Sequence, residues 1–238
     1  MNVLAIGAHP DDVEYYCGGT LAKYASQGHK VFTATATNGN IGSATLSKDE
    51  IAKIRKEEAR RAAAHIGAEY ICLDYDDEMF YEDRDVRLKF IDLVRYCKAD
   101  VILTHNPVDY NPDHMLTSKI VSDINVMIPI AKLETKNKPV DKIPSIIYFE
   151  SYKSLGFIPT EYVDITDFID IKMQMCNEHQ SQISWMQANY KDSVGQSNFL
   201  DDVRITARFR GNQCGVDYAE GFRLPENLHG LTTYRILP

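Results

Sequence analysis

Close to its N-terminus the chain reads VLAIGAHPDDVE over residues 3–14, and this stretch predicts how the fold begins. The apolar run at 3–7 is short and continuous, which is typical of a buried strand. The loop at 8–12 is polar, and residues 13–27 carry apolar side chains at helical spacing up to Gly28, a residue type that often ends helices. A buried strand, a loop and a helix in this order are the opening unit of a parallel α/β sheet.

The alternation of strands and helices continues over residues 1–150 without a linker. It predicts a Rossmann-like α/β fold, a mostly parallel sheet of five or six strands with helices on both faces. Residues 151–238 are expected to form a helical C-terminal addition that packs on this core, so that the whole chain is one domain. Strands are predicted at 30–37, 69–73, 100–104 and 145–149, and helices at 47–66, 86–97, from 113 onward, at 167–188 and after 197, before a short tail.

Composition and charge narrow the class of protein. The 238 residues are 44% hydrophobic and 25% charged, values typical of a globular chain and not of a disordered or coiled-coil one. The net charge of −8 disfavours binding to nucleic acid and to anionic membrane surfaces. Five cysteines are spread without a CxxC pair, which favours reduced thiols and a cytoplasmic location. We expect no signal peptide and no membrane span, because the N-terminal segment and the apolar runs have neither pattern.

Two loops concentrate the residues that could carry chemistry. The loop after the first strand holds His9, Asp11 and Asp12, and the proline-rich loop at 104–114 ends in His114. Because strands one and four flank the switch point of such a sheet, we expect both loops to meet at its carboxyl edge. Two imidazoles and one carboxylate, with an open position for water, suit Zn²⁺, and Fe²⁺ or Mn²⁺ suits the same ligands. Taken singly, the loops could instead be a helix N-terminus and a stiff turn with solvated acids.

The two loops resemble motifs of the LmbE/PIG-L deacetylase family: AHPDDVE at 8–14 with GGTL at 18–21, and DYNPDH at 109–114. Weaker similarities extend over nearly the whole chain, at 55–58, 164–166, 179–182 and 215–222. Members of this family are zinc-dependent hydrolases that remove N-acyl groups, mostly acetyl groups from amino sugars. The resemblance therefore implies a zinc hydrolase whose substrate is a small-molecule acylated amino sugar or glycoconjugate.

The resemblance also implies roles for individual residues. The family's metal ligands fall on His9, Asp12 and His114, with one Zn²⁺ per chain, and its general base falls on Asp11. We expect Asp11 to take the proton of the attacking water and to return it to the leaving amine. Relatives are often homo-oligomers, which the sequence does not test. Two alternatives stay open: an amidase on a sugar-linked conjugate with the same site, and a metal-binding member that has lost turnover. A Rossmann-type nucleotide binder is disfavoured, because G-x-G-x-x-G does not follow the first strand.

Some positions depart from the family pattern or leave two interpretations. Many relatives have a histidine where this chain has Asn111, which we expect to donate a neutral and weaker hydrogen bond to the oxyanion. His105 is a second candidate for that role, and its alternative is a strand-end histidine bonded to the backbone. Relatives often have a glutamate where this chain has Asn40, which we expect to contact the substrate without charge. Arg55 is a candidate for binding a substrate or product carboxylate, the alternative being a solvated residue on a helix surface.

An acidic segment at 74–85 holds seven acids and one arginine. We expect it to be a solvated loop. The alternative is an acidic rim of the active site that favours neutral or amine-bearing substrates. His179, in the C-terminal region, is expected to pack in the core.

Overall fold

Seven strands form one sheet in the order β3-β2-β1-β4-β5-β7-β6. The computed structural model describes residues 1–154, 156–189, 199–225 and 237–238. The strands are β1 (Asn2–Gly7), β2 (Lys30–Thr37), β3 (Glu69–Tyr75), β4 (Val101–His105), β5 (Ser145–Phe149), β6 (Glu161–Asp164) and β7 (Ala219–Arg223). The helices are α1 (Asp12–Ser26), α2 (Lys48–Ala64), α3 (Arg84–Cys97), α4 (Pro112–Ile124), α5 (Ile169–Asn177), α6 (Gln180–Asn189) and α7 (Phe199–Cys214).

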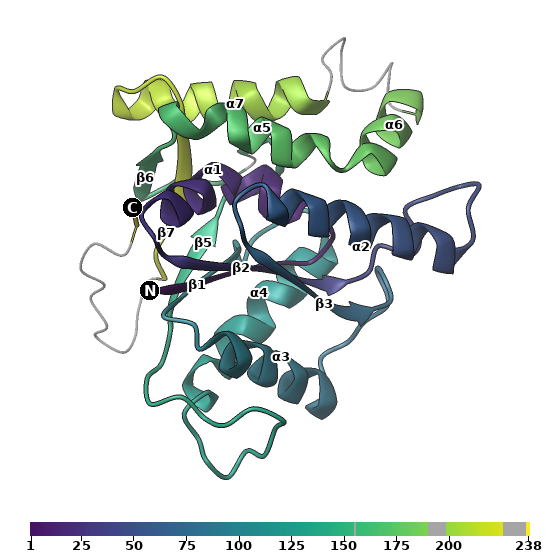
Figure 1. Cartoon of the computed structure of the whole chain (residues 1–238), viewed down its shortest axis with the longest axis vertical. Coiled ribbons are helices and arrows are strands. Elements are labelled where there is room, and N and C mark those ends of the chain that lie inside the picture. Colours follow the sequence, from purple (N-terminus) through teal and green to yellow (C-terminus); the bar gives the residue numbers. More distant parts are fainter. Residues whose placement is uncertain (155, 190–198, 226–236) are drawn as a thin grey trace.

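Helices cover both faces of the sheet (Figure 1). Helices α3 and α4 lie on one face, and α1 and α2 lie on the other. Helices α5, α6 and α7 form a further layer on the side of α1 and α2, where α5 packs against both of them and α7 packs on β7. This arrangement confirms the predicted α/β fold with a mostly parallel sheet between helices.

Local sequence signals explain where the N-terminal elements begin. Helix α2 starts with a capping box, in which the Ser47 side chain accepts the amide of Glu50 and the Glu50 carboxylate accepts the amide of Ser47. Helix α3 is capped by Asp83, whose carboxylate accepts the amide of Val86 at 2.8 Å. These caps satisfy backbone donors that a helix N-terminus leaves unpaired, so each helix begins at a defined residue.

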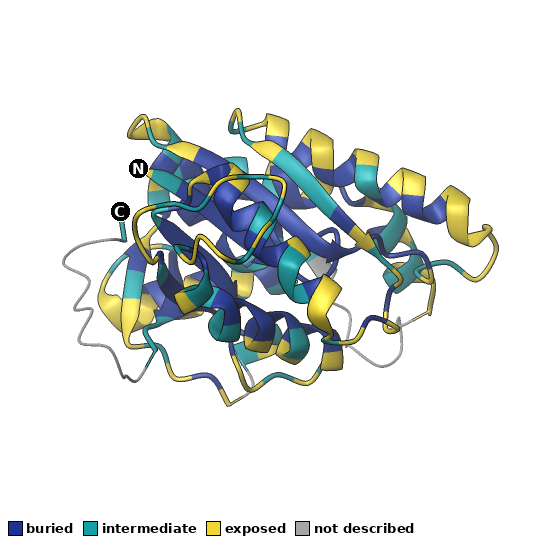
Figure 2. Ribbon diagram, turned by 90° about the horizontal axis from the view of Figure 1, so that it is seen from below, coloured by how far each residue is buried: buried dark blue, intermediate teal, exposed yellow. Residues whose placement is uncertain are grey.

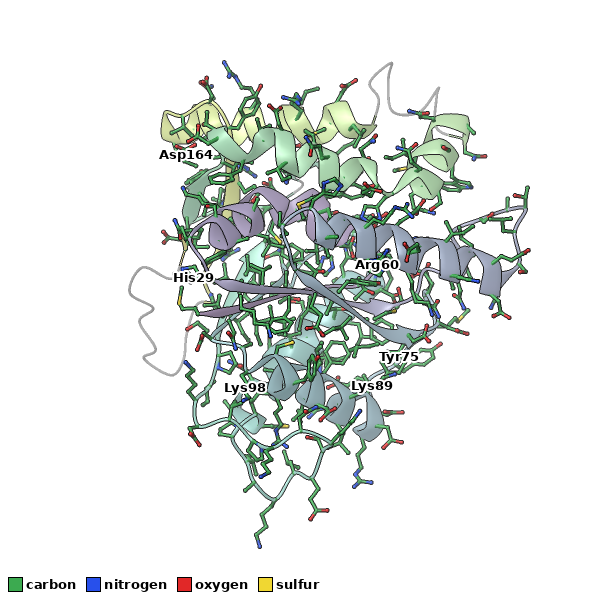
Figure 3. The ribbon with its side chains drawn as sticks, in the orientation of Figure 1. His29, Arg60, Tyr75, Lys89, Lys98 and Asp164 are labelled. Carbon is green, nitrogen blue, oxygen red and sulfur yellow. The ribbon has the colours of Figure 1, made fainter. Side chains whose placement is uncertain are left out.

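The order of the strands places the loops after β1 and β4 together. Strand β1 is parallel to β2 on one side and to β4 on the other, so the sheet is built outward from β1 in both directions. Such a switch point leaves a crevice at the carboxyl edge of the strands. Figure 3 labels His29, just before β2, and Tyr75, at the end of β3, so the carboxyl edge lies on the Tyr75 side. The contact between the two loops, described below, confirms the predicted meeting point.

Two apolar clusters fill the two faces of the sheet. Leu4 and Phe90 belong to the cluster under α3 and α4, whereas Val3 and Phe222 belong to the cluster under α1, α5 and α7. Val3 and Leu4 are neighbours in β1 and face opposite clusters because strand side chains alternate between the two faces. Figure 2 shows the buried strands inside helices whose outer sides are exposed.

The C-terminal region differs from the prediction in two respects. The helix predicted at 167–188 is broken, because α5 ends at Asn177 and α6 starts at Gln180, with buried His179 in the turn between them. Strands β6 and β7 were not predicted; β7 pairs antiparallel with β5 and with β6 and extends the sheet to seven strands. The C-terminal addition is therefore helical only in part. The tail predicted after α7 lies largely in 226–236, outside the described residues.

No helix in the described part of the chain is long and apolar enough to cross a membrane. All five cysteines lie among the described residues and are free thiols. Cys17, Cys97 and Cys176 are buried, as expected for reduced thiols that pack as small apolar side chains.

Candidate active site

The loop after β1 is folded tightly against the start of α1. A Cβ atom at Gly7 would lie 2.8 Å from the Cβ of Asp12, so glycine is required for this close approach. The Asp12 carboxylate accepts the amide of His9 at 2.7 Å. The turn thereby holds His9, Asp11 and Asp12 together at the carboxyl edge of the sheet.

The side chains of His9, Asp12 and His114 converge on one point. Nδ1 of His9 lies 3.2 Å from Nε2 of His114, which lies 3.3 Å from Oδ1 of Asp12. Two nitrogens that each lie ~2.0–2.1 Å from a tetrahedral ion are about 3.3 Å apart. The spacing is therefore that of donor atoms around one small metal ion, and it joins the three residues predicted as ligands.

A carboxylate stands behind each of the two imidazoles. Nε2 of His9 lies 2.9 Å from Asp77, and Nδ1 of His114 lies 3.1 Å from Asp109. When an imidazole donates its outer N–H to a carboxylate, its other nitrogen presents a lone pair to a metal. Both rings are therefore oriented with their inner nitrogens toward the shared point.

The site carries more negative than positive charge. Five buried carboxylates surround the two imidazoles, and the guanidinium of Arg55 contacts two of them. Buried charge is costly unless an opposite charge compensates it. A divalent cation between His9, Asp12 and His114 would supply that charge, so the residues present fit a metal ion such as Zn²⁺. The five carboxylates are those of Asp11, Asp12, Asp77, Asp109 and Asp113.

Asp11 occupies a strained backbone position next to these residues. Its φ of 140° lies outside the regions that L-residues favour. Burial raises the pKa of the Asp11 carboxyl to about 6, against the opposing effect of Arg55. A carboxyl group that titrates near neutral pH is suited both to accept a proton and to return it.

Arg55 lies inside the site. The residue is 4% exposed, and its Nη2 atom lies 3.3 Å from Oδ2 of Asp11 and donates to the Pro10 carbonyl at 3.1 Å. Gly39 leaves room for it, because a Cβ there would lie 2.4 Å from Nη1 of Arg55. The alternative of a solvated surface arginine is therefore wrong. Its predicted contact with substrate stays a prediction.

Asn111 and Asn40 are engaged with the backbone of the site loops. Oδ1 of Asn111 accepts the amide of Asp113 at 2.7 Å and caps α4, while its Nδ2 donates to Glu78 at 2.9 Å. Asn40 is 6% exposed and accepts the amide of Asp77 at 3.1 Å. The structure gives both residues partners within the protein, and their predicted contacts with the oxyanion and the substrate stay predictions.

The two neighbouring histidines differ in charge. Burial lowers the pKa of His105 to about 4, with a further decrease from His114, so His105 is neutral at pH 7. Nε2 of His105 lies 2.9 Å from the amide nitrogen of Ala8, which confirms the predicted backbone bond. Burial also lowers the pKa of His114, but the carboxylates of Asp12 and Asp109 outweigh it and raise that pKa to about 9. A metal ligand must be a neutral imidazole, so a metal ion bound here would displace a proton from His114.

The carboxylates that hold the histidines carry no local signal of that role in the sequence. Asp77 lies in the acidic segment expected to be solvated, yet it is 5% exposed, so that expectation is wrong for this residue. One signal in the sequence could have indicated Asp77. It follows the third strand and therefore lies at the same edge of the sheet as the other site loops. Composition alone could not single it out, because Asp76 and Glu78 flank it.

The turn between α5 and α6, together with the start of α6, fastens two helices that carry site residues. Nε2 of the fully buried His179 lies 3.2 Å from Glu14, in the first turn of α1. Ser181 donates its hydroxyl to the Glu58 carboxylate at 2.6 Å and its amide to the same group at 2.8 Å. Glu58 follows Arg55 by three residues in α2, so this turn ties the backbone around Asp11 to the backbone around Arg55. The prediction that His179 packs in the core is confirmed.

Known proteins resemble this chain in sequence and in structure. Residues 4–125, just over half of the chain, match the family model PIG-L: GlcNAc-PI de-N-acetylase. The chain is 28% identical over 231 residues to the diacetylchitobiose deacetylase of Thermococcus kodakarensis, which covers 93% of this chain and 82% of that protein. It is 27% identical over 184 residues to the 4-oxalmesaconate hydratase of Pseudomonas putida, covering 72% and 70%. The solved structure of N,N'-diacetylchitobiose deacetylase from Pyrococcus horikoshii superimposes with a TM-score of 0.80 at 26% identity, over 97% of this chain and 87% of that one.

Proposed function

Because the chain belongs to the PIG-L family, we propose that it is a zinc-dependent hydrolase that removes an acyl group, here acetyl, from the nitrogen of an amino sugar. The observation that carries the proposal is the convergence of His9, Asp12 and His114 beside the strained Asp11. The similarity to two diacetylchitobiose deacetylases supports this reaction over others. The substrate class is a small-molecule acylated amino sugar or glycoconjugate.

We assign the metal ion to His9, Asp12 and His114. A divalent ion held there supplies Lewis acidity: it polarises the acyl carbonyl and lowers the pKa of a water molecule. Asp77 and Asp109 hold the two imidazoles in the orientation that binding requires. Zn²⁺ suits two imidazoles and a carboxylate at this spacing, and Fe²⁺ and Mn²⁺ are the alternatives to be tested.

Asp11 moves the proton in the proposed reaction. Arg55 contacts Oδ2 of Asp11 and keeps the carboxylate in place, so Oδ1 is the atom that takes the proton of the attacking water. The same carboxyl group then gives the proton to the amide nitrogen as the C–N bond breaks, and the products are acetate and the free amine. The pKa of about 6 lets Asp11 perform both steps near neutral pH.

The core and the C-terminal extension contribute differently to the proposed activity. We propose that residues 1–150 act as the α/β core that carries the metal-binding residues and Asp11, and that the described part of 151–238 acts as the extension packed on it. The five free thiols fit work in a reducing compartment, for which we propose the cytoplasm.

The test combines metal content with acetate release. The purified protein is analysed for bound metal and then supplied with a panel of N-acetyl amino sugars, with Asp11→Asn as the matched variant. About one zinc per chain together with acetate release that Asp11→Asn lacks supports the proposal. A protein that binds no metal even after reconstitution with Zn²⁺, Fe²⁺ or Mn²⁺ contradicts the site assignment.

Metal without acetate release would point to one of two other activities or to a loss of activity. A sugar-linked conjugate that releases a different acid would identify an amidase with the same site. Hydration of 4-oxalmesaconate would place the chain with the hydratase relative instead of the deacetylases. Zinc bound tightly without turnover of any of these compounds would identify a metal-binding member that has lost activity.

A further inference from the structure

The proposed site has a charged side and an aromatic side. The order of the strands places different side chains on the two sides of the loop after β1. Toward β2 and β3, the guanidinium of Arg55 contacts the carboxylates of Asp11 and Asp77. Toward β4 and β5, the rings of His105 and Phe149 lie with their centroids 4.8 Å apart. An amide held at the metal-binding residues would therefore have charged groups on one side and aromatic rings on the other.

Tyr16 adds a further ring to the aromatic side. It lies in α1 about one helical turn after Asp12, so both side chains project from the same face of the helix. Its ring is stacked on that of Phe149, with centroids 5.5 Å apart and planes inclined by 13°. Its ring also makes T-shaped contacts with His105 and His114, at centroid distances of 5.9 and 6.2 Å. These contacts hold the Tyr16 ring as a wall beside the proposed ligand His114.

A narrow pocket shares the Tyr16 ring with the proposed site. Tyr16 lines this pocket together with Val203, Ala207 and Ala219, and the lining includes neither the proposed metal ligands nor Asp11. The pocket has a volume of about 50 Å³, whereas one water molecule needs ~10–15 Å³. It is therefore too small for a sugar ring but large enough for a few methylene groups.

The buried charges at this pocket have partners within the protein. Nζ of Lys172 lies 2.5 Å from Glu220, and Nε of Arg210 donates to Glu150 at 2.9 Å. Because each charge is compensated, the pocket does not need a charged ligand. The side chains from α7 and β7 add apolar surface, so a short hydrocarbon chain suits the space.

The two halves of an N-acetyl amino sugar need different surroundings. The sugar is large and polar and has to extend toward solvent, whereas the acetyl methyl group is small and apolar. Against Arg55 and its carboxylates, the methyl group would displace water from charged groups, which is unfavourable. Against the Tyr16 ring, the methyl group would leave water for an apolar surface, which is favourable. We therefore expect the methyl group to face Tyr16.

We infer that Tyr16 is the specificity-determining residue for the acyl group, because its ring closes the aromatic side of the site and limits the group that is removed to acetyl. The inference rests on the proposed function for the position of the amide carbonyl. It states which acid is released, which the metal ligands and Asp11 do not determine. Without the Tyr16 ring, the site would open into the pocket and accept longer acyl chains.

The test compares three acyl groups on one sugar. N-acetyl-, N-propionyl- and N-butyrylglucosamine are supplied to the wild type, Tyr16→Ala and Tyr16→Phe, and kcat/KM for release of glucosamine is measured together with zinc content. Each added methylene should lower the wild-type kcat/KM by about 10-fold or more. Tyr16→Ala should raise the butyryl-to-acetyl ratio by about 10-fold or more, whereas Tyr16→Phe keeps the ring and should keep the wild-type ratio.

Two results would overturn the inference. One is equal wild-type kcat/KM for the three acyl groups. The other is an unchanged butyryl-to-acetyl ratio in a Tyr16→Ala protein that holds zinc at the wild-type level. If Tyr16→Ala does not fold, Tyr16→Leu removes the ring but keeps an apolar side chain in α1, and it should raise the ratio in the same direction.

Further variants locate the longer acyl chain. Ala207→Leu, combined with Tyr16→Ala, fills the pocket and should remove the gain in the ratio. Tyr110→Ala is the matched control, because the Tyr110 ring also lies 5.6 Å from that of His114 but is on a residue that is 63% exposed. It should leave the ratio unchanged. A gain that survives Ala207→Leu, or an equal gain in Tyr110→Ala, contradicts the assignment to Tyr16 and this pocket.

Binding separates this inference from the proposed function. Dissociation constants of N-acetyl- and N-butyrylglucosamine are measured by NMR titration of the zinc-loaded Asp11→Asn protein, with and without Tyr16→Ala. If Tyr16→Ala favours binding of the butyryl sugar but the wild type releases no amine from any of the three sugars, the role of Tyr16 is supported and the hydrolase is contradicted. If the wild type releases acetate and Tyr16→Ala changes neither ratio, the hydrolase is supported and the role of Tyr16 is contradicted.

Discussion

Charged groups are buried in two parts of this molecule, and their surroundings differ. In the C-terminal layer, Lys172 pairs with Glu220 and Arg210 pairs with Glu150, and Glu220 also accepts the amides of two residues of α1. At the carboxyl edge of β1 and β4, five carboxylates surround two imidazoles, and Arg55 contacts two of the five. Burial is similar in the two regions, whereas the balance of charge is not.

Burial of charge does not by itself mark a functional site. A compensated pair such as Lys172–Glu220 holds α1, α5 and β7 together and needs nothing further. An excess of carboxylates over cations favours a bound cation, and inner nitrogen atoms facing each other at 3.2 Å beside Asp12 have the spacing of ligands around one ion. The second pattern identifies the region where chemistry is expected, and four substitutions can test the distinction.

The largest effect is expected at Asp11. The Asp11→Asn protein should lose acetate release by roughly 10²–10⁴-fold, because the amide cannot take up and return a proton. Its metal content should stay at the wild-type level, which elemental analysis of the same sample checks. Loss of metal together with activity would mean that Asp11 serves as a ligand and not as the base.

Lys172 should show the opposite behaviour. Lys172→Met leaves the Glu220 carboxylate buried without its cation and should reduce the free energy of unfolding by about 3–5 kcal/mol. Urea denaturation measures this effect, and the Lys172→Met/Glu220→Gln double variant should recover part of it. Lys119→Met, which breaks exposed pairs with Glu82 and Asp123, is the control and should cost less than about 1 kcal/mol. Equal losses of unfolding free energy in Lys172→Met and Lys119→Met would contradict the expected difference between buried and exposed ion pairs.

The carboxylate behind His9 should affect metal binding by an intermediate amount. Asp77→Asn cannot accept the imidazole proton with a full negative charge, so zinc affinity should fall by about 10–100-fold. Competition with a chromogenic chelator measures the change. Asp85→Asn, an exposed acid from the same segment, is the matched control and should bind zinc as the wild type does. If both variants lost affinity equally, general negative charge and not the contact with His9 would be responsible.

The smallest effect is expected at Asn111. Asn111→Ala removes the cap of α4 and should destabilise the protein by about 1 kcal/mol, whereas Asn111→Ser keeps a capping oxygen and should stay close to wild type in thermal unfolding. Acetate release by Asn111→Ser decides the catalytic question, because serine also lacks the amide donor. Little change in rate fits the bond from Asn111 to Glu78, and a loss of about 10²-fold would identify Asn111 as the oxyanion donor.

The sequence predicted the first half of the molecule better than the second for a physical reason. Strands such as Val101–His105 are buried on both faces and are read as continuous apolar runs, and the Ser47–Glu50 capping box fixes a helix start locally. Strand β7, AEGFR at Ala219–Arg223, contains two charged residues and a glycine. Strand β7 is buried because Lys172 and the neighbouring strands pack against it. These partners are distant in the sequence, so no local pattern predicts the strand.

The candidate site, like the fold, could be predicted where local motifs report it and not where distant contacts form it. His9, Asp12 and His114 sit in two short motifs, and the switch point of a parallel sheet brings such loops together. Asp77 and the burial of Arg55 could not be read in this way, because each depends on contacts between loops from different strands. The break before Gln180 is of the same kind, since buried His179 is held by Glu14 of α1.

The backbone of Asp11 has a consequence for how the chain would respond to selection. Its φ of 140° is easily adopted by glycine, and strain of this kind costs of the order of 1–3 kcal/mol in other residues. An Asp11→Gly chain would also lose a buried carboxylate, and we expect it to melt at a higher temperature than the wild type. A population selected only for resistance to heat would therefore lose aspartate at this position, whereas a population whose growth depends on conversion of the substrate would keep it.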